Sequence, residues 1–409
     1  MWINFEQTLA QRLELQQLNQ EQNRARNLRS KGAAIVRGVA GSGKSLVLKN
    51  RVEKLLEDYE HILVLTYNRF MNGWLKSQLD SKSSKKIECK TFHQWAYKYL
   101  NYSYDDDIDK LVDLARKSTK RYQAILIDEA QDFYDQWFQT LIEVLDSRTK
   151  ALFIVYDNTQ SVYGQAHRRS ADWSWKNLGI KIPGGRSQVF DLNYRNSPEI
   201  LELAWKFIVP ALESAGIKSE RRERDEEGKI IHTPGIGSVI EPRKKLSRSS
   251  GIKPALLEVY YEDMPDKIAY EVQAALATHT ESSIGILVHP QAKDLKREIS
   301  KELANLKIEH YAPETSRDRD GNVVTRPYVI VDSWNALKGV EFDAVIIAGV
   351  DSLSEYKSPD AEISFEAKAG LYTAMTRAKD HLIMLYEDRN AVVTEIEAAL
   401  EAVDCLHGV

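Results

Sequence analysis

The sequence predicts an α/β protein with two parallel-sheet domains, on the basis of its length, its composition and the order of its apolar segments. The chain has 409 residues, and one hydrophobic core rarely serves more than about 250–300 residues. Hydrophobic residues make up 43% of the chain, which is typical of a folded protein and not of a disordered one. Short apolar runs alternate with helical patterns throughout, as expected for strands covered by helices.

The first half contains five apolar runs of the length expected for strands that are buried on both faces. These runs are residues 33–37, 61–67, 87–91, 124–127 and 151–156. Helical patterns lie between them at residues 46–57 and 134–145, and a charged helical insertion is expected at residues 105–120. The alternation indicates a parallel sheet in this half.

The second half repeats the alternation and predicts a second sheet. Its expected strands are residues 255–261, 283–288, 328–331, 344–348 and 381–386. Its expected helices are residues 267–277, 293–306 and 365–376. Ser197 and Pro198 are typical of a helix start, so we place the domains at residues 1–195 and 196–409. The charged segment near 218–250 is predicted to be an exposed excursion of the second domain.

Composition argues against several classes of protein. The net charge of −4 gives no overall basic field for nucleic acid, although a local basic stripe is compatible with it. Cys89 and Cys405 are far apart, so a disulfide framework or a zinc finger is not expected. The first residues do not resemble a signal peptide, and no apolar run approaches the ~20 residues that span a bilayer. We therefore expect a soluble, cytoplasmic protein without a membrane partner.

The strongest local motif lies between the expected strand 33–37 and the expected helix 46–57. Its residues are Gly38, Val39, Ala40, Gly41, Ser42, Gly43, Lys44 and Ser45, which have the spacing of a phosphate-binding P-loop. Glycines let the backbone N–H groups turn toward phosphates beside a helix N-terminus. Lys44 is then expected to contact the β- and γ-phosphates and Ser45 to hold Mg²⁺. The sequence therefore predicts ATP and Mg²⁺ as cofactors, in a site that extends to Leu46.

A pair of carboxylates follows the expected strand 124–127. Asp128 and Glu129 would lie at the carboxyl edge of the sheet, where open α/β sheets bind ligands. Asp128 is suited to coordinate Mg²⁺, and Glu129 to act as the general base on the attacking water. A strand that ends in Asp-Glu is common, so this prediction depends on the P-loop upstream.

The order of these and further motifs resembles superfamily 1 helicases of the UvrD/Rep type. The resemblance implies two RecA-like domains with ATP in the cleft between them. Residues 18–22 resemble the Q motif of the family, which implies that Gln22 contacts the adenine edge. Residues 157–163 resemble its coupling motif, which implies that Gln160 senses the γ-phosphate. Residues 63–68 and 89–93 resemble motifs that touch single-stranded DNA.

The resemblance continues through the second half, to about residue 379. It implies that Arg195 and Arg377 are the two arginine fingers, and that residues 334–343, with Gly339 and Glu341, contact the ribose side of the nucleotide. Phosphoryl transfer needs such positive charge at the γ-phosphate, which raises rates by on the order of 10³–10⁵. For each arginine the alternative interpretation is a surface salt bridge.

The nucleic-acid contacts implied by the resemblance have a structural alternative, because aromatic side chains at strand ends often pack against the sheet. The implied contacts are Tyr67, Asn68, Thr91, Phe92, His93, Tyr163 and Ser333. The sequence departs from the family pattern after Tyr163, where Gly164 stands in place of an aromatic residue. The large accessory subdomain of the family is also missing, and a short polar loop at 313–326 replaces it.

The function implied by the resemblance is an ATP-dependent translocase or helicase that moves on single-stranded DNA in the 3′-to-5′ direction. One alternative is an ATPase switch stimulated by DNA or by a partner, within a larger assembly such as a nuclease or defence complex. Another is an RNA helicase of the same superfamily. Because the chain is compact, a partner protein is expected to supply duplex separation or nuclease activity.

Overall fold

The computed structural model describes residues 18–67, 69–78, 85–103, 105–161, 173–278, 282–315, 318–320, 329–353 and 364–403. Within these residues the chain forms two compact units. We call residues 18–191 with 221–240 the N-terminal unit, and residues 192–220 with 241–403 the C-terminal unit. Each unit has its own sheet and is described by itself.

The described part of the N-terminal unit contains a six-stranded parallel sheet in the order β3-β2-β4-β5-β1-β6. Its strands are β1 Ala34–Gly38, β2 Ile62–Thr66, β3 Ile87–Thr91, β4 Ala124–Ile127, β5 Ala151–Tyr156 and β6 Ser187–Phe190. All five strands predicted in this half are confirmed. The sixth, β6, was not predicted, because only its last two residues, Val189 and Phe190, are apolar.

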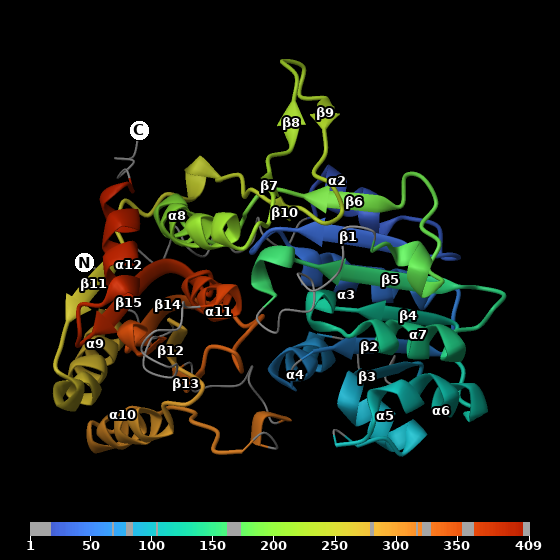
Figure 1. Ribbon diagram of the computed structural model, residues 1–409. Coiled ribbons are helices and arrows are strands. Elements are labelled where there is room, and N and C mark those ends of the chain that lie inside the picture. Colours follow the sequence, from blue (N-terminus) through green and yellow to red (C-terminus); the bar gives the residue numbers. More distant parts are fainter. Residues whose placement is uncertain are drawn as a thin grey trace. The chain divides into compact units, whose positions relative to one another are not determined.

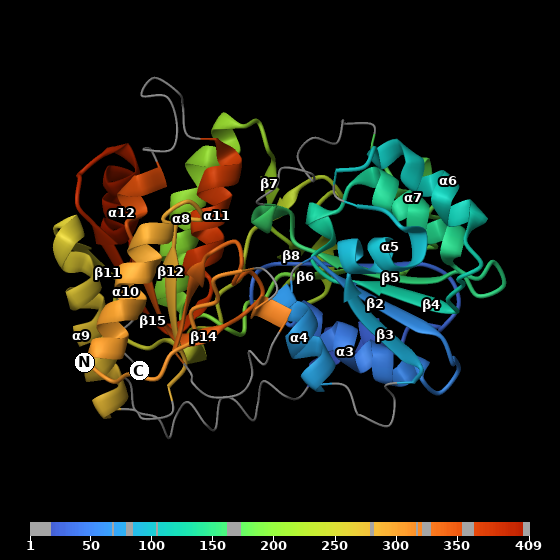
Figure 2. The same cartoon turned by 90° about the horizontal axis from the view of Figure 1, so that it is seen from below.

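Helices cover both faces of this sheet. Its helices are α2 Gln20–Arg26, α3 Lys44–Leu55, α4 Arg69–Gln78, α5 Phe92–Leu100, α6 Leu111–Lys117 and α7 Asp135–Val144. Alternate strand residues pack on one side against α2 and α3 and on the other against α5, α6 and α7, as Figure 2 shows for α3 and for α5 to α7. Strands buried on both faces explain the continuous apolar runs in the sequence.

The segment Arg221–Ile240 belongs to the N-terminal unit, which differs from the prediction that it is an excursion of the second domain. Figure 1 shows it as a hairpin of β8 Glu223–Arg224 and β9 Ile230–His232 that extends away from β1 and β6, followed by β10 Val239–Ile240. Ion pairs from Arg222 and Arg224 to Glu21 of α2 hold it there. Such long-range pairs leave no periodic pattern in the sequence.

The described part of the C-terminal unit contains a five-stranded sheet in the order β11-β15-β14-β12-β13, with all pairs parallel. Its strands are β11 Ala255–Glu258, β12 Ile284–Val288, β13 Val329–Ser333, β14 Phe342–Ala348 and β15 Ala378–Tyr386, with the two-residue β7 Ser219–Glu220 outside this sheet. These five strands confirm the five predicted for this half.

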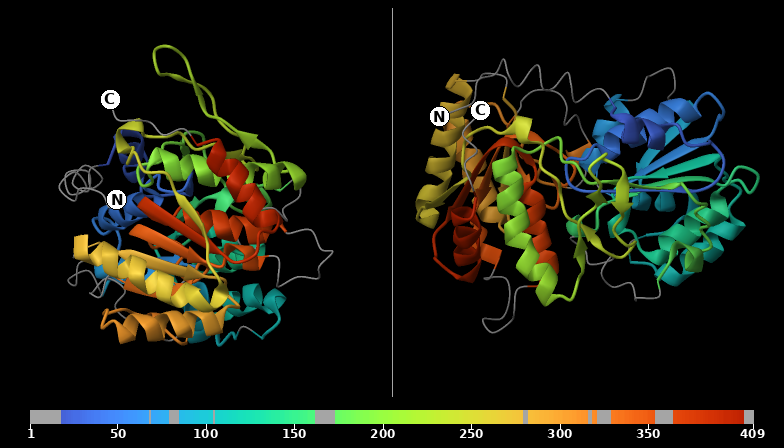
Figure 3. Two further views of the ribbon diagram at one scale, coloured as in Figure 1. Left: turned by 90° about the vertical axis from the view of Figure 1, so that its left-hand side faces the viewer. Right: turned by 90° about the horizontal axis from the view of Figure 1, so that it is seen from above.

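The helices of the C-terminal unit also lie on both sides of its sheet. They are α8 Pro198–Ser214, α9 Met264–Thr278, α10 Lys293–Asn305, α11 Phe365–Met375 and α12 Ala391–Glu401. Apolar residues of α9 and α10 pack on one face of the sheet, and the right-hand view of Figure 3 shows the gold α9 and the green α8 on opposite sides of the red strands. Ser197 caps α8 and Pro198 opens it, as the sequence predicted.

None of the helices in the described ranges is both long and apolar enough to cross a membrane.

Candidate nucleotide-binding site

The glycine-rich segment connects β1 to α3 in the centre of the N-terminal sheet. Gly41 and Gly43 have φ angles of 63° and 82°, which side chains disfavour. A Cβ atom on Gly43 would lie 2.5 Å from the amide nitrogen of Gln22, and one on Gly38 would lie 2.5 Å from the Ser42 hydroxyl. The tight course of this loop therefore requires glycine at these positions, as a backbone cradle for phosphate does.

Lys44 is the first residue of α3 and turns back over the loop. Its Nζ donates to the carbonyl oxygens of Gly38 and Val39, at 2.8 and 2.9 Å. The same Nζ lies 3.6 Å from a carboxylate oxygen of Asp157, which follows β5. The ammonium group is buried, and the lower dielectric there strengthens its attraction for a phosphate bound in the loop.

Asp128 and Glu129 follow β4 and are both buried. Burial raises the pKa of Asp128 to about 7, and the charge of Glu129 adds to this, while the Ser45 hydroxyl and Lys44 act in the opposite direction. Glu129 has a φ of 53°, a conformation that costs a non-glycine residue free energy and that is enriched at functional sites. Two adjacent buried carboxylates are costly unless a cation approaches them.

A hydrogen-bonded chain links Glu129 to the end of β5. The amide of Gln131 donates to Glu129 and accepts from the backbone N–H of Asp157, at 3.1 Å for the second bond. Asp157 in turn accepts from the Gln160 amide at 2.7 Å. Gln131 and Asp157 were missing from the predicted site residues. Asp157 is the first residue of segment 157–163, which resembles the coupling motif, and this position is the signal that could have identified it.

The donor groups fit Mg²⁺ and a triphosphate. Within the described residues, Oδ2 of Asp128 is buried without a hydrogen-bond partner, and the Ser45 hydroxyl is close enough to lower the pKa of this carboxyl group. Carboxylate and hydroxyl oxygens are ligands that Mg²⁺ prefers. Gly43 is the N-cap of α3 and provides no side-chain acceptor. The first N–H groups of α3 can therefore donate to a bound anion.

Gln22 lies beside the loop, with both ends of its amide engaged. Its Nε2 donates to the carbonyl oxygen of Ser42 at 2.9 Å, and its Oε1 accepts from the backbone N–H of Asn19 at 2.9 Å. The structure thus brings Gln22 to the predicted site, where it supports the loop backbone. Leu46 lies in the first turn of α3 and is half-buried.

The predicted nucleic-acid residues of this unit separate into different environments. Phe92 is only 1% exposed, and its ring stacks on Trp137 at 4.2 Å between centroids. Phe92 is therefore a core residue, which corrects its predicted role as a base contact, because a ring covered by the core has no face left for a base.

The neighbours of Phe92 have local structural roles. The Thr91 side chain caps α5 through the N–H of Gln94. His93 packs edge-on against Trp137 at 4.9 Å, and burial lowers its pKa. Tyr67 is half-buried beside the same tryptophan. Asn68 and Tyr163 lie outside the described residues.

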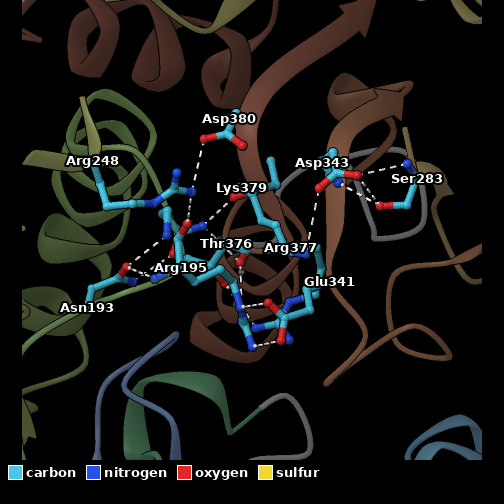
Figure 4. Close-up of polar contacts among 12 residues, drawn as sticks. Asn193, Arg195, Arg248, Ser283, Glu341, Asp343, Thr376, Arg377, Lys379 and Asp380 are labelled. Carbon is cyan, nitrogen blue, oxygen red and sulfur yellow. Dashed lines mark hydrogen bonds and ion pairs between the residues drawn. The ribbon is translucent and has the colours of Figure 1, made fainter. Parts of the chain in front are cut away.

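In the C-terminal unit, Arg195 and Glu341 form an ion pair that Figure 4 shows face to face. The distances are 3.1 Å from Arg195 Nε and 3.4 Å from Arg195 Nη2 to the two carboxylate oxygens. Partial desolvation opposes ionisation of Glu341, whose side chain is 44% exposed, but the charges of Arg195, Lys379 and Arg377 outweigh it and lower the pKa of this carboxyl group to about 2. Both predicted residues are therefore charged and adjacent.

Arg377 lies between α11 and β15 and is 1% exposed. Its guanidinium donates to the carbonyl oxygen of Thr373 at 3.0 Å and to the Thr376 hydroxyl at 3.2 Å. Gly339 precedes β14 with a φ of 86°. Ser333 ends β13, where its hydroxyl accepts from the N–H of Ala336. The structure thus brings Arg377 near Arg195 and Glu341 (Figure 4).

Residues 21–166 match a family model described as an AAA domain. The matched segment contains the P-loop, Asp128, Glu129 and Gln160. Together with the parallel sheet and the glycine geometry, this match defines the class of the N-terminal unit as a P-loop NTPase.

Two solved structures are similar to the chain at low sequence identity. The C-terminal domain of a possible DNA helicase from Lactobacillus plantarum WCFS1 is 16% identical, with a TM-score of 0.32, and the alignment covers 50% of this chain and 95% of that chain. Arterivirus nonstructural protein 10, a helicase in complex with DNA, is 9% identical, with a TM-score of 0.37 and coverage of 93% of this chain and 65% of that chain. No curated protein matches the sequence.

Proposed function

We propose that this chain is an ATP hydrolase that moves along single-stranded DNA in the 3′-to-5′ direction, as a compact relative of the UvrD/Rep helicases. The observation that supports it best is the meeting of Lys44, Asp128, Glu129 and Gln160 at the carboxyl ends of the neighbouring strands β1, β4 and β5. These groups are the set that phosphoryl transfer requires.

In this proposal Lys44 and the loop N–H groups bind the β- and γ-phosphates, and Ser45 and Asp128 hold Mg²⁺. Mg²⁺ supplies charge neutralisation of the phosphates. Glu129 orients the attacking water and takes its proton, which is the role that suits a carboxylate held beside a cation. Gln160, held by Asp157, reports the presence of the γ-phosphate to the rest of the chain.

The C-terminal unit is proposed to supply the remaining positive charge. Arg195 and Arg377 would act as arginine fingers on ATP bound between the units, with Glu341 and Gly339 on the ribose side. Arg195 already has a carboxylate partner in Glu341, so exchange of this partner for the γ-phosphate is a means of coupling hydrolysis to motion. Tyr67, Asn68, Thr91, His93, Tyr163 and Ser333 remain the proposed DNA contacts.

Steady-state ATP hydrolysis with no polymer, single-stranded DNA, duplex DNA or RNA tests this proposal. We expect hydrolysis that requires Mg²⁺ and is stimulated most by single-stranded DNA, with stimulation that weakens as salt rises because phosphate contacts dominate such binding. Stimulation by RNA alone would contradict the DNA assignment. Hydrolysis without any polymer effect would favour the switch subunit over the translocase.

A further inference from the structure

Arg37 is a buried charge directly in front of the P-loop. It lies on β1, one residue before Gly38, and is 4% exposed. Its guanidinium donates from Nη1 to the carbonyl oxygen of Gly235 and from Nη2 to that of Pro234. A buried cation needs such partners, because the cost of removing it from water is otherwise large. These hydrogen bonds therefore connect β1, which leads into the P-loop, to a segment about 200 residues later in the sequence.

The segment that accepts these bonds is Arg221–Ile240, which we call the strap. At its first residues, Arg222 and Arg224 each lie 3.0 Å from one carboxylate oxygen of Glu21 in α2. The same two arginines lie 3.4 and 3.6 Å from Asp191, which follows β6. Arg222 also donates to the carbonyl oxygen of Val189 on β6 at 2.8 Å. Glu21 directly precedes Gln22, whose amide donates to the loop carbonyl of Ser42.

A third contact reaches the end of β5. Asn158 Nδ2 lies 3.5 Å from the carbonyl oxygens of Ile236 and Ser238 in the strap. Its neighbour Asp157 lies 3.6 Å from the Lys44 ammonium and accepts from Gln160. The strap thus contacts Arg37, Glu21 and Asn158. Each of these residues is adjacent in sequence to a residue of the nucleotide site.

We propose that the strap sets the affinity of the P-loop for nucleotide, with Arg37 and Glu21 as positioning residues. This inference depends on the proposed ATPase function. The strap does not reach the reacting atoms through any contact described above, whereas Glu129 and Gln160 keep their own partners. Loss of the attachment at Arg37 or at Glu21 therefore changes how the loop and Gln22 are held, while Glu129 and Gln160 keep the hydrogen bonds that place them.

The test compares Arg37→Met, Arg37→Lys and Glu21→Gln with the wild type in steady-state ATP hydrolysis and in binding of Mg²⁺ with a non-hydrolysable ATP analogue. We expect Arg37→Met and Glu21→Gln to raise the KM for ATP and the Kd of the analogue by about 5-fold or more, the lower end of typical coupling between sites, with little change in kcat. Arg37→Lys retains the positive charge but not the second donor group, so its KM should lie between those of the wild type and Arg37→Met.

Glu226→Gln is the matched control, because Glu226 lies in the exposed turn of the same hairpin, and it should leave KM unchanged. If Arg37→Met does not fold, Glu21→Gln decides the outcome, since Glu21 lies on a partly exposed helix face. Unchanged KM and Kd in a folded Glu21→Gln would overturn the inference. A wild type that binds no nucleotide would overturn the proposed function as well, so the two failures are distinguishable.

A second measurement distinguishes coupling to nucleotide binding from a merely structural role of the strap. If an attached strap favours nucleotide binding, bound nucleotide must favour the attached strap by the same factor. We expect the non-hydrolysable analogue with Mg²⁺ to slow hydrogen exchange at residues 221–224 and 234–240 in the wild type, and less so in Arg37→Lys. Equal exchange with and without bound analogue would contradict the proposal.

Discussion

Lys44 and Glu129 occupy the two ends of the proposed phosphoryl-transfer site, and their contacts suggest separable roles. Lys44 binds loop carbonyl groups and lies near Asp157, so its charge belongs to the binding surface for phosphates. Glu129 is held by Gln131 in a strained backbone conformation, which is the arrangement of a preorganised base.

We expect Lys44→Ala to abolish nucleotide binding or turnover, and Glu129→Gln to retain binding while kcat falls by about 10²–10⁴-fold, the usual contribution of a general base. Binding and single-turnover hydrolysis of ATP measure the two effects. Glu57→Gln, an exposed change after α3, serves as control. Near wild-type turnover by Glu129→Gln would refute its catalytic role.

We expect His289 to make the free energy of unfolding of the C-terminal unit depend on pH. Burial lowers its pKa from the ordinary 6.5 to about 4. Below pH 6.5 the unfolded chain therefore takes up a proton that the folded chain does not, so the free energy of unfolding decreases as the pH falls from 6.5 toward 4.

His289→Phe keeps a ring beside Trp334, which His289 contacts edge-on at 5.1 Å, and removes the titration. We expect this variant to lose less stability than the wild type between pH 6.5 and pH 4. Denaturant unfolding at a series of pH values measures the difference. Parallel curves for the two proteins would show that the histidine does not contribute.

At the scale of elements, the junction of β3 and α5 combines a helix cap with a core residue. Thr91 and Gln94 form a reciprocal capping box, and Phe92 follows the cap into the aromatic core beside Trp137. This arrangement fixes the start of α5 and thereby the place of His93.

Thr91→Ala should lower the free energy of unfolding by about 0.5–2 kcal/mol, because the N–H of Gln94 loses its acceptor. Thr91→Ser keeps the hydroxyl oxygen and should lose less. Urea unfolding of the three proteins measures this order. If Thr91→Ala and Thr91→Ser were equally stable, the capping contribution would be contradicted.

At the scale of the whole molecule, the proposed mechanism divides phosphate binding and transition-state charge between the two units. The site residues up to Gln160 belong to the N-terminal unit, and Arg195, Glu341 and Arg377 belong to the C-terminal unit. Arginine fingers act mainly on charge that develops in the transition state, so their loss should affect turnover more than ground-state binding.

We expect Arg195→Ala and Arg377→Ala to lower kcat by about 10³-fold or more, with a smaller effect on the Kd of ATP. Because Arg377 is buried and bonded within its own unit, its variant requires a thermal melt beside the assay, and Arg195 provides the cleaner test. Arg389→Ala removes an exposed arginine of the same unit and should leave kcat unchanged. Equal kcat in Arg195→Ala and Arg389→Ala would exclude the finger role of Arg195.

Local pattern was sufficient to predict the strands of the two large sheets except β6, the P-loop and the two carboxylates after β4. A strand buried on both faces needs a continuous apolar run, and a tight phosphate loop needs glycine, so both leave a signature within a few residues. Strand β6 had no such run, because only Val189 and Phe190 of its four residues are apolar.

The tertiary structure alone decided which distant residues meet. It placed Phe92 in the core, paired Arg195 with Glu341, brought Asp157 to Lys44 and fastened the strap to Arg37 and Glu21. Each of these contacts joins segments that are far apart in the chain, and a charge or an aromatic ring has the same local sequence whether it meets solvent, a ligand or another segment. Their partners therefore follow from the packing of the whole fold.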